Sequence, residues 1–538
     1  MNPAVGVDLG TTNTVVAVQI DATGPRTLDI LQPVDERNVH VPRDHIKSAV
    51  YFDSPETAVV GAFAAGRLEA FRSIKSRMGL RCKFKHPTRE RTSITPPWIS
   101  AHILRLACQQ VRVDFPDWDG KAIVTVPASF NTDQRNDTLR ASTLAGFQEV
   151  HLLDEPTAAF YYFFDQNRQE FAEKDKQTIL VFDFGGGTLD VSIIRVITSG
   201  SELCIDPIGR SRYNNLGGDD IDVELASFFL GLWERREGEG LEALAADERK
   251  YLMQLFVRRS SEFKEEAEYY LANDQPLNEF IIDHELPKTR RPIHFRCQLT
   301  RPQYEEISGR FFLDKGDLNV FRPIGQAIEV ARSIVPGFGK DDIDLVLYTG
   351  GASRMTGLKA ALAAYFAPKP CFSITEEEAC NTVALGAASC RYDEMQGKSG
   401  VRTTYRLLES IFTRDDENGE YVPIVPLTCE PSDAFTRVET SFQLQRPAIQ
   451  LTLPLFRGVG PHDHHLVPMQ DLVFQLDRVI PSQSAYRLFY RMTHNKTLEI
   501  RAVFDSGKGA PVQVDSEVEI HQEGKVKGPP KVPLAQIN

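Results

Sequence analysis

The sequence contains two copies of one pattern, in which an apolar strand is followed by an Asp-x-Gly turn and a second apolar strand. The first copy is VGVDLGTTNTVVAV (Val5–Val18), and the second is ILVFDFGGGTLDVSIIRV (Ile179–Val196). Asp8 of the first copy aligns with Asp183 of the second. An internal repeat at this wide spacing predicts two related lobes that face each other.

The residue types in these turns suit a phosphate group. Gly10 aligns with Gly185, and Gly186 and Gly187 follow in the second copy. Glycines let backbone N–H groups approach phosphate oxygens without interference from a Cβ atom. The neighbouring carboxylates would repel phosphate, but they suit a hydrated magnesium ion that bridges phosphates. The two turns together predict a clamp for a triphosphate and Mg²⁺, although either turn alone could be an ordinary hairpin.

A third glycine-containing segment is DLVLYTGGASRMTGLKAAL (Asp344–Leu362). A buried strand enters Gly350 and Gly351 and leaves as a helix that carries Arg354. Such a junction lets a flat nucleoside come close to helix N-terminal amides. A tight structural turn would explain this segment equally well, so the prediction of a nucleoside pocket depends on the two hairpins. The chain has no G-x-x-x-x-G-K-[S/T] segment, which excludes a Walker-type site.

The composition limits the class of protein. With 538 residues, 42% hydrophobic and 25% charged, the chain has ordinary globular usage and room for several domains of about 150 residues each. A formal net charge of −13 opposes nucleic acid as the main partner. No apolar run approaches the ~20 residues of a membrane span, no signal peptide precedes Asp8, and the eight cysteines form no Cys-x-x-Cys pair. These features predict a soluble cytoplasmic protein with no membrane partner.

The pattern of apolar residues differs between two parts of the chain. Over residues 1–392, short apolar strands alternate with amphipathic stretches, which predicts an α/β body with helices packed on sheets. Residues 393–403 are polar, contain two glycines and are predicted to be a linker. Over 404–520, apolar residues recur at every second position, as in Leu498–Phe504, which predicts an all-β, sandwich-like domain. Residues 521–538 have no periodicity and are predicted to be a flexible tail.

These segments, in this order, resemble the actin-like ATPase superfamily, and specifically the seventy-kilodalton heat-shock chaperones (DnaK-like). The resemblance covers nearly all of 1–392 through AIVTVPASFNTDQRNDTLRASTLAGFQEVHLLDEPTAAF (Ala122–Phe160), LGGDDID (Leu216–Asp222) and LTRPQYEEI (Leu299–Ile307). The β module resembles the family's peptide-binding domain more weakly, through YVPIVPLT (Tyr421–Thr428). The resemblance implies a two-lobed actin-like ATPase domain followed by a β-sandwich-like domain. No long amphipathic helix follows the β module here, as in a variant without the family's helical lid.

The resemblance implies a role for individual residues. The phosphates of ATP or ADP would be held by Gly10, Thr11, Thr12, Asn13, Gly185, Gly186 and Gly187. The adenosine would lie against Lys264, Gly350, Gly351 and Arg354. Mg²⁺ would be held through water by Asp8 and Asp183. Hydrolysis would use Lys75, Glu155, Asp183, Thr188 and Asp190, and an interdomain switch would use Pro127 and Arg135.

The residue types fit these roles. Lys75 would place an ammonium group where charge develops on the transferring phosphoryl group. Glu155 would orient the attacking water or couple to Pro127, and Asp190 would complete the positioning of the water. Each residue also has a plain explanation, with Lys75 as a solvated lysine and the two acids as helix-start and hairpin residues.

Several positions depart from the family pattern. Glu265 stands where a basic residue normally stacks over adenine, and Cys380 stands where an aspartate lies near the nucleoside, so we expect a lower affinity for ATP. His151 replaces an arginine that docks J-domain partners, which weakens the case for such a partner. The predicted linker contains no leucine, so coupling between hydrolysis and peptide capture stays an open question.

Three hypotheses follow for the function. The first is a chaperone-like protein that hydrolyses ATP and thereby controls binding of a polypeptide client by the β domain, with a nucleotide-exchange factor as a second candidate partner. The second is a nucleotide-gated scaffold that docks one dedicated partner protein. The third is a small-molecule kinase on the same fold, against which the VPAS and EPTAA segments and the β module argue.

Overall fold

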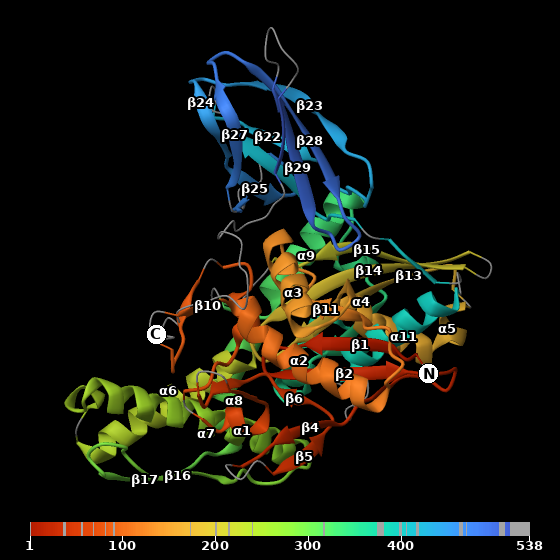
Figure 1. Cartoon of the computed structure of the whole chain (residues 1–538). Helices are drawn as coiled ribbons and strands as arrows, with labels where there is room; N and C mark the ends of the chain where they lie inside the picture. The colour runs from red at the N-terminus through yellow and green to blue at the C-terminus, as the bar shows by residue number, and fades with distance from the viewer. Residues whose placement is uncertain are drawn as a thin grey trace.

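The computed structural model describes residues 2–35, 39–54, 57–67, 69–80, 82–89, 92–172, 174–199, 202–212, 216–238, 240–315, 318–373, 381–397, 401–404, 406–415, 419–461, 466–469, 471–504 and 512–516. Cys380 and the predicted tail 521–538 lie outside these ranges. Figure 1 shows a large α/β body and a smaller β domain that stands on one side of it.

Two sheets with matching strand orders form the centre of the body. The first sheet runs β12 (Glu149–Asp154), β11 (Lys121–Val126), β1 (Ala4–Leu9), β2 (Asn13–Gln19) and β3 (Arg26–Thr27), with β6 (Ile46–Lys47) also paired to β2. The second runs β19 (Cys371–Ser373), β18 (Leu345–Thr349), β13 (Lys176–Phe184), β14 (Leu189–Ser199), β15 (Glu202–Arg210) and β20 (Val401–Thr403). In each sheet an antiparallel hairpin, β1–β2 or β13–β14, is extended by a parallel strand, β11 or β18. The predicted internal repeat is therefore confirmed.

Helices α4 (Glu155–Gln166) and α11 (Thr382–Gln396) lie between the two sheets. Helix α11 packs on β1, β2 and β11, helix α4 packs on β13 and β14, and the two helices pack on each other. They share one hydrophobic cluster with both sheets. Every residue of α11 from Thr382 to Cys390 is buried. This burial on all sides explains why each side chain in the first half of α11 is either small or apolar.

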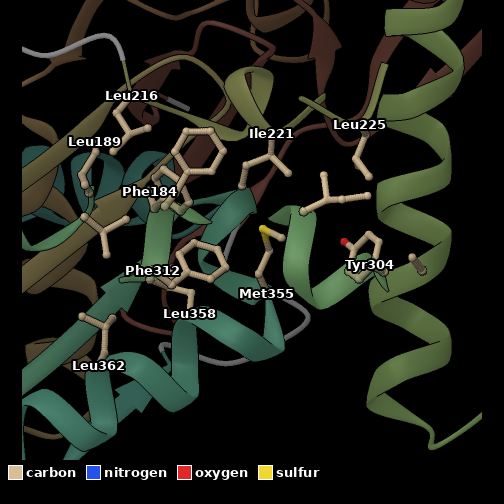
Figure 2. Packing of buried hydrophobic residues seen from close by; sticks show 14 of the residues in the cluster. Phe184, Leu189, Leu216, Ile221, Leu225, Tyr304, Phe312, Met355, Leu358 and Leu362 are labelled. Carbon is tan, nitrogen blue, oxygen red and sulfur yellow. The ribbon is translucent and has the colours of Figure 1, made fainter. Parts of the chain in front are cut away.

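Each sheet has further helices of its own and forms a lobe with them. In the first lobe, α2 (Pro96–Asp114) and α3 (Thr132–Ala145) share a hydrophobic cluster with the sheet. The second lobe adds α6 (Gly218–Glu237), α7 (Ala246–Ala272), β16 (Glu279–Glu285), β17 (Pro292–Gln298), α8 (Arg301–Ser308), α9 (Phe321–Ile334) and α10 (Thr356–Phe366). Figure 2 shows part of its core, where Phe184 of the sheet, Ile221 of α6 and Leu358 of α10 pack together.

Shorter elements complete the body. They are β4 (Ile30–Pro33), β5 (His40–Arg43), β7 (Val50–Phe52), β8 (Ala58–Val60), α1 (Ala62–Ala65), β9 (Phe84–Lys85), β10 (Ser93–Ile94), α5 (Arg168–Ala172) and the 3₁₀ helices η1 (Ile74–Arg77), η2 (Leu241–Ala243), η3 (Gly309–Phe312), η4 (Lys340–Asp342) and η5 (Gly351–Arg354).

Beyond residue 404, every regular element of the described residues is a strand. One sheet runs β22 (Tyr421–Val425), β21 (Ser410–Arg414), β25 (Leu455–Gly458) and β26 (Val467–Pro468). The other sheets are β23 (Thr436–Gln443), β28 (Ala485–Met492), β29 (Leu498–Phe504) and β30 (Val512–Ser516), and the pair β24 (Ala448–Leu453) and β27 (Leu472–Ile480). In β29 each second residue is buried, as its alternating sequence predicts. Their inner faces share one hydrophobic core.

The segment predicted to be a linker is partly regular. Helix α11 continues to Gln396, so the first residues of 393–403 are helical. Strand β20 then joins the second sheet, where Val401 to Thr403 pair in parallel with Leu203 to Ile205 of β15. The chain therefore reaches the β domain along the edge of the body. None of the helices in the described part of the chain is both long and apolar enough to cross a membrane.

Candidate active site

The turns that follow β1 and β13 come from different lobes and lie against each other. A Cβ atom built on Gly186 would lie 2.1 Å from Oγ1 of Thr12, and one built on Gly187 would lie 2.8 Å from Cγ2 of Thr11. Non-bonded atoms do not approach this closely, so these positions accept only glycine while the turns keep their places. The two predicted phosphate turns are therefore neighbours in space.

The first turn offers a polar atom to a ligand, and the second turn is closed by a hydrogen bond of its own. Oδ1 of Asn13, which follows the turn that starts at Gly10, is buried and has no hydrogen-bond donor among the described residues. The second turn starts at Gly185, whose N–H donates to the carbonyl oxygen of Thr188 at 3.0 Å. A buried acceptor without a donor is costly, so Asn13 suits a ligand or bound water that donates to it.

Three carboxylates gather behind these turns. Oδ1 of Asp8 accepts a hydrogen bond of 3.1 Å from Oγ1 of Thr125. Asp183 and Asp190 are directly opposite each other in the β13–β14 hairpin. Burial, together with the charges of Asp8 and Asp190, raises the pKa of Asp183 to about 7. This surplus of buried negative charge favours a cation at the site.

The donor set fits a hydrated Mg²⁺ ion. Within the described ranges, no group of three or more His, Cys, Asp and Glu side chains could hold a metal ion directly. Mg²⁺ usually keeps several waters and is held by one or two carboxylates together with phosphates. Asp8 and Asp183, at the ends of β1 and β13, are therefore suited to hold it through water.

Lys75 and Glu155 form a buried ion pair next to these carboxylates. Nζ of Lys75, in η1, donates a hydrogen bond to Oε1 of Glu155 at the start of α4. Although burial opposes its charged form, the charges of Glu155 and Asp8 raise the pKa of Lys75. The side chain of Lys75 is only 7% exposed. The plain explanation of Lys75 as a solvated lysine is therefore wrong.

Asp190 is oriented by a residue that the sequence analysis did not single out. Its Oδ1 accepts a hydrogen bond of 2.6 Å from Oγ of Ser129. Its Oδ2 is buried and has no donor among the described residues. A carboxylate that is fixed at one oxygen and open at the other can accept a hydrogen bond from a water molecule. Ser129 and Thr125 belong to the quoted segment around VPAS, but a hydroxyl next to or within an apolar strand has no pattern that marks it.

The predicted nucleoside segment lies beside the second turn. Gly350 has φ of 87°, and a Cβ atom there would lie 2.5 Å from Oδ1 of Asp183. Gly351 and Arg354 form the ends of η5, and Arg354 is exposed. Nζ of Lys264 lies 2.7 Å from Oδ1 of Asp222 and donates to the carbonyl oxygen of Gly218 at 2.7 Å. The LGGDDID segment therefore anchors Lys264 near the turns.

Glu268 is a second residue that sequence reasoning missed near this segment. Its Oε2 accepts hydrogen bonds from the N–H and Oγ1 of Thr356 at 2.9 and 3.1 Å. Its Oε1 accepts one of 2.9 Å from the hydroxyl of Tyr304. Glu268 thereby joins α7 to α8 and α10. Glu265, three residues earlier on α7, is exposed.

Of the two predicted switch residues, Arg135 lies in α3 and Pro127 directly follows β11. Arg135 is 2% exposed, and its guanidinium donates to Oδ1 of Asp154 at 2.6 Å and to the carbonyl oxygen of Phe130 at 3.2 Å. The carbonyl oxygen of Pro127 accepts a hydrogen bond of 3.0 Å from Phe130. Arg135 therefore contacts the residue that immediately precedes Glu155.

The comparison with known proteins identifies the family. The family model described as Hsp70 protein matches residues 73–401, which is more than half of the chain. The chain belongs to the Hsp70 family. Among its relatives is the chaperone protein DnaK of Thermotoga maritima, with 27% identity over 500 residues, 88% of this chain and 76% of that protein.

Two further DnaK proteins match the chain over shorter spans. The chaperone protein DnaK of Mycoplasma mycoides is 32% identical over 392 residues, 71% of this chain and 58% of that protein. The one of Thermus thermophilus is 29% identical over 409 residues, 72% and 60% of the two chains. This Hsp70 protein is therefore a DnaK-like, ATP-binding chaperone, as the resemblance implied.

Proposed function

We propose that this Hsp70 protein is a slow Mg²⁺-dependent ATPase and that hydrolysis controls the binding of a polypeptide segment by the β domain. The buried Lys75–Glu155 pair beside the two facing turns carries this proposal. Transfer of a phosphoryl group to water depends mainly on positioned charge and a positioned water molecule. The ammonium group of Lys75 would supply the charge, and Asp190 would hold the water. The body would act as the two-lobed actin-like ATPase that the family implies.

Each side chain at the site would have a separate role in hydrolysis. The N–H groups of the glycine turns would bind phosphate oxygens, and the ammonium group of Lys75 would stabilise charge on the transferring group. Oδ2 of Asp190 would hold the attacking water. Burial raises the pKa of Glu155, which makes its carboxylate a better acceptor for the water's proton. Mg²⁺, held through Asp8 and Asp183, would neutralise phosphate charge.

The β domain contacts the body directly beside this machinery. Nζ of Lys496 lies 2.6 Å from Oδ2 of Asp154, the residue before Glu155. Oδ1 of Asn495 accepts a hydrogen bond of 2.8 Å from the N–H of Leu152. A shift of Glu155 during hydrolysis would therefore reach the loop between β28 and β29. This contact offers a route for coupling that does not depend on leucines in the linker.

Substitution of Lys75 tests the ATPase. We expect Lys75→Met to lower kcat on the order of 10²-fold, since it removes one electrostatic stabiliser of the transition state. Lys121→Met is a matched control, because Lys121 forms an exposed surface pair with Glu149 far from the turns. Phosphate release would be measured with and without Mg²⁺. Equal turnover in the wild type and Lys75→Met would remove Lys75 from the mechanism.

Peptide binding separates a chaperone from a scaffold and a kinase. A set of labelled apolar peptides would be titrated with the full chain in ATP and in ADP, and a chaperone should bind many of them with an affinity that changes with the nucleotide. The scaffold would be favoured if the chain bound none of the peptides and bound one partner protein instead. A strong rise in ADP production on addition of sugars or glycerol would favour the kinase.

A further inference from the structure

A cavity at the junction of the body and the β domain lies outside the active site just described. It has room for a few water-sized groups. Its charged lining residues are Arg135, Asp154, Arg210, Arg406, Glu409, Arg457 and Lys496. The first three belong to the body and the other four to the chain beyond the linker, so the cavity exists only while the two parts are docked.

Two ion clusters line this cavity and a third adjoins it through Arg406, and each has two cations for one carboxylate. In the first, Asp154 binds both Arg135 and Lys496. In the second, Oε2 of Glu409 lies 2.7 Å from Arg210 and 3.7 Å from Arg457. The third is formed by Asp206, Arg195 and Arg406.

Within the part of the chain that the structure describes, these clusters carry more positive than negative charge. Six cations face three carboxylates, an excess of three positive charges in the described residues of the clusters. The side chains of Arg457 and Lys496 are only 10% and 12% exposed, so water screens them little. Helix α3 begins at the cavity, where its N-cap Asn131 and Thr132 form part of the lining. A helix N-terminus adds further positive potential. The cavity therefore favours an anion.

Glu409 restricts which anion fits. Its Oε1 is buried, and no donor among the described residues reaches it. Although burial favours the neutral form, the charges of Arg210 and Arg457 lower the pKa of Glu409, so that it remains a carboxylate. A ligand in this cavity must satisfy the guanidinium groups with oxygens and must also donate one hydrogen bond to Oε1 of Glu409.

We propose that this junction cavity binds inorganic hydrogen phosphate. The ion combines a double negative charge with one O–H group, so that its bare oxygens face Arg457 and its neighbours while its hydroxyl donates to Glu409. Sulfate has the same shape and charge but no proton to donate at neutral pH. The site is therefore selective for phosphate over sulfate, and it does not depend on ATP hydrolysis.

The bound ion would hold the two parts of the chain together. Residues of the body and of the β domain contribute to the same cavity, so an ion that binds only the docked arrangement stabilises it by mass action. A rise in the concentration of inorganic phosphate, whether in the surrounding solution or from hydrolysis of ATP, would thus favour the docked arrangement of the two parts.

Calorimetry on the full chain without nucleotide or Mg²⁺ tests the site, with inorganic phosphate as the probe at matched ionic strength. We expect phosphate to bind at least ~10-fold more tightly than sulfate, because sulfate leaves a buried acceptor unpaired. Glycerol phosphate is a third arm, and tighter binding of this ester would assign the site to a phosphorylated metabolite instead. Equal binding of phosphate and sulfate, or binding of neither, would overturn the proposal.

Variants distinguish this cavity from the phosphate turns. Arg457→Gln should weaken phosphate binding at least ~10-fold by removing a charged hydrogen-bond donor. Glu409→Gln should let sulfate bind as well as phosphate, since its amide group can donate. Arg491→Gln is the control, because Arg491 pairs with Glu499 away from the cavity. If Lys75→Met loses phosphate and Arg457→Gln keeps it, the ion binds at the active site, which overturns this inference and leaves the proposed function intact.

Discussion

Removal of Lys496 is expected to loosen the β domain from the body. Its Nζ lies 2.6 Å from Oδ2 of Asp154, and the two side chains are 12% and 9% exposed. Loss of one partner of a buried ion pair typically costs about 3–5 kcal/mol. Because Asp154 keeps Arg135 as a partner, we expect Lys496→Met to cost somewhat less, about 2–3 kcal/mol.

The substitution should lower the free energy of docking between the β domain and the body, and it should leave the free energy of folding of the β domain unchanged. The loop that carries Lys496 is closed by its own hydrogen bonds, of 2.9 Å from the N–H of Thr493 to the carbonyl oxygen of Thr497 and of 2.6 Å between their hydroxyl groups. The loop therefore keeps its shape when the ammonium group is removed, while its ion pair with Asp154 is lost.

Hydrogen exchange of β20 measures the effect. Its amides are paired with β15 only while the linker lies on the body, so exchange that proceeds through undocking should accelerate roughly 30- to 150-fold in Lys496→Met. Asp154→Asn and the double variant complete a cycle that gives the coupling energy. Lys121→Met, which breaks an exposed pair, should leave the exchange unchanged. Unchanged exchange in Lys496→Met, or a coupling energy near zero, would refute the reasoning.

Three further substitutions test the active site and the first lobe. Gly186→Ala should lower kcat/KM for ATP ~10²-fold, because its Cβ would push the facing turns apart, whereas Gly231→Ala in α6 meets only Arg235 at 3.8 Å and should keep full activity. Ser129→Ala should lower kcat ~10-fold or more with little change in KM, since Asp190 loses the hydroxyl that orients it. Burial raises the pKa of Asp137 to about 6 from 3.8, so the folded state loses stability as the pH rises through this window. Asp137→Asn keeps an acceptor for the N–H of Gly79 and should raise the free energy of unfolding by up to about 3 kcal/mol above pH of about 7, but not below about pH 4, and coincident pH profiles of the two proteins would contradict this.

The strands and turns of the active site could be predicted because their signals are local. Runs of apolar residues broken by Asp-x-Gly mark β1–β2 and β13–β14, and the facing of Gly186 and Thr12 follows from the repeat. The alternation in Leu498–Phe504 likewise predicts β29, because a strand alternates its faces regardless of its partners.

The structure of the linker could not be predicted from its local sequence. Its polar composition predicts an irregular connector, yet α11 extends into it to Gln396 and Val401–Thr403 adds a strand to the second sheet. An edge strand needs a partner with free backbone groups, and β15 supplies that partner from almost two hundred residues earlier in the sequence.

The sequence by itself determined the family, the repeated hairpins and the residue types that suit a nucleotide and Mg²⁺. Only the tertiary structure decided that Lys75 meets Glu155, that Ser129 orients Asp190, and that arginines of the body and of the β domain crowd around Glu409. The physical reason is that charge and burial depend on every group within a few ångströms, and in these sites those groups come from distant parts of the chain. A pattern of neighbours along the sequence cannot carry that information.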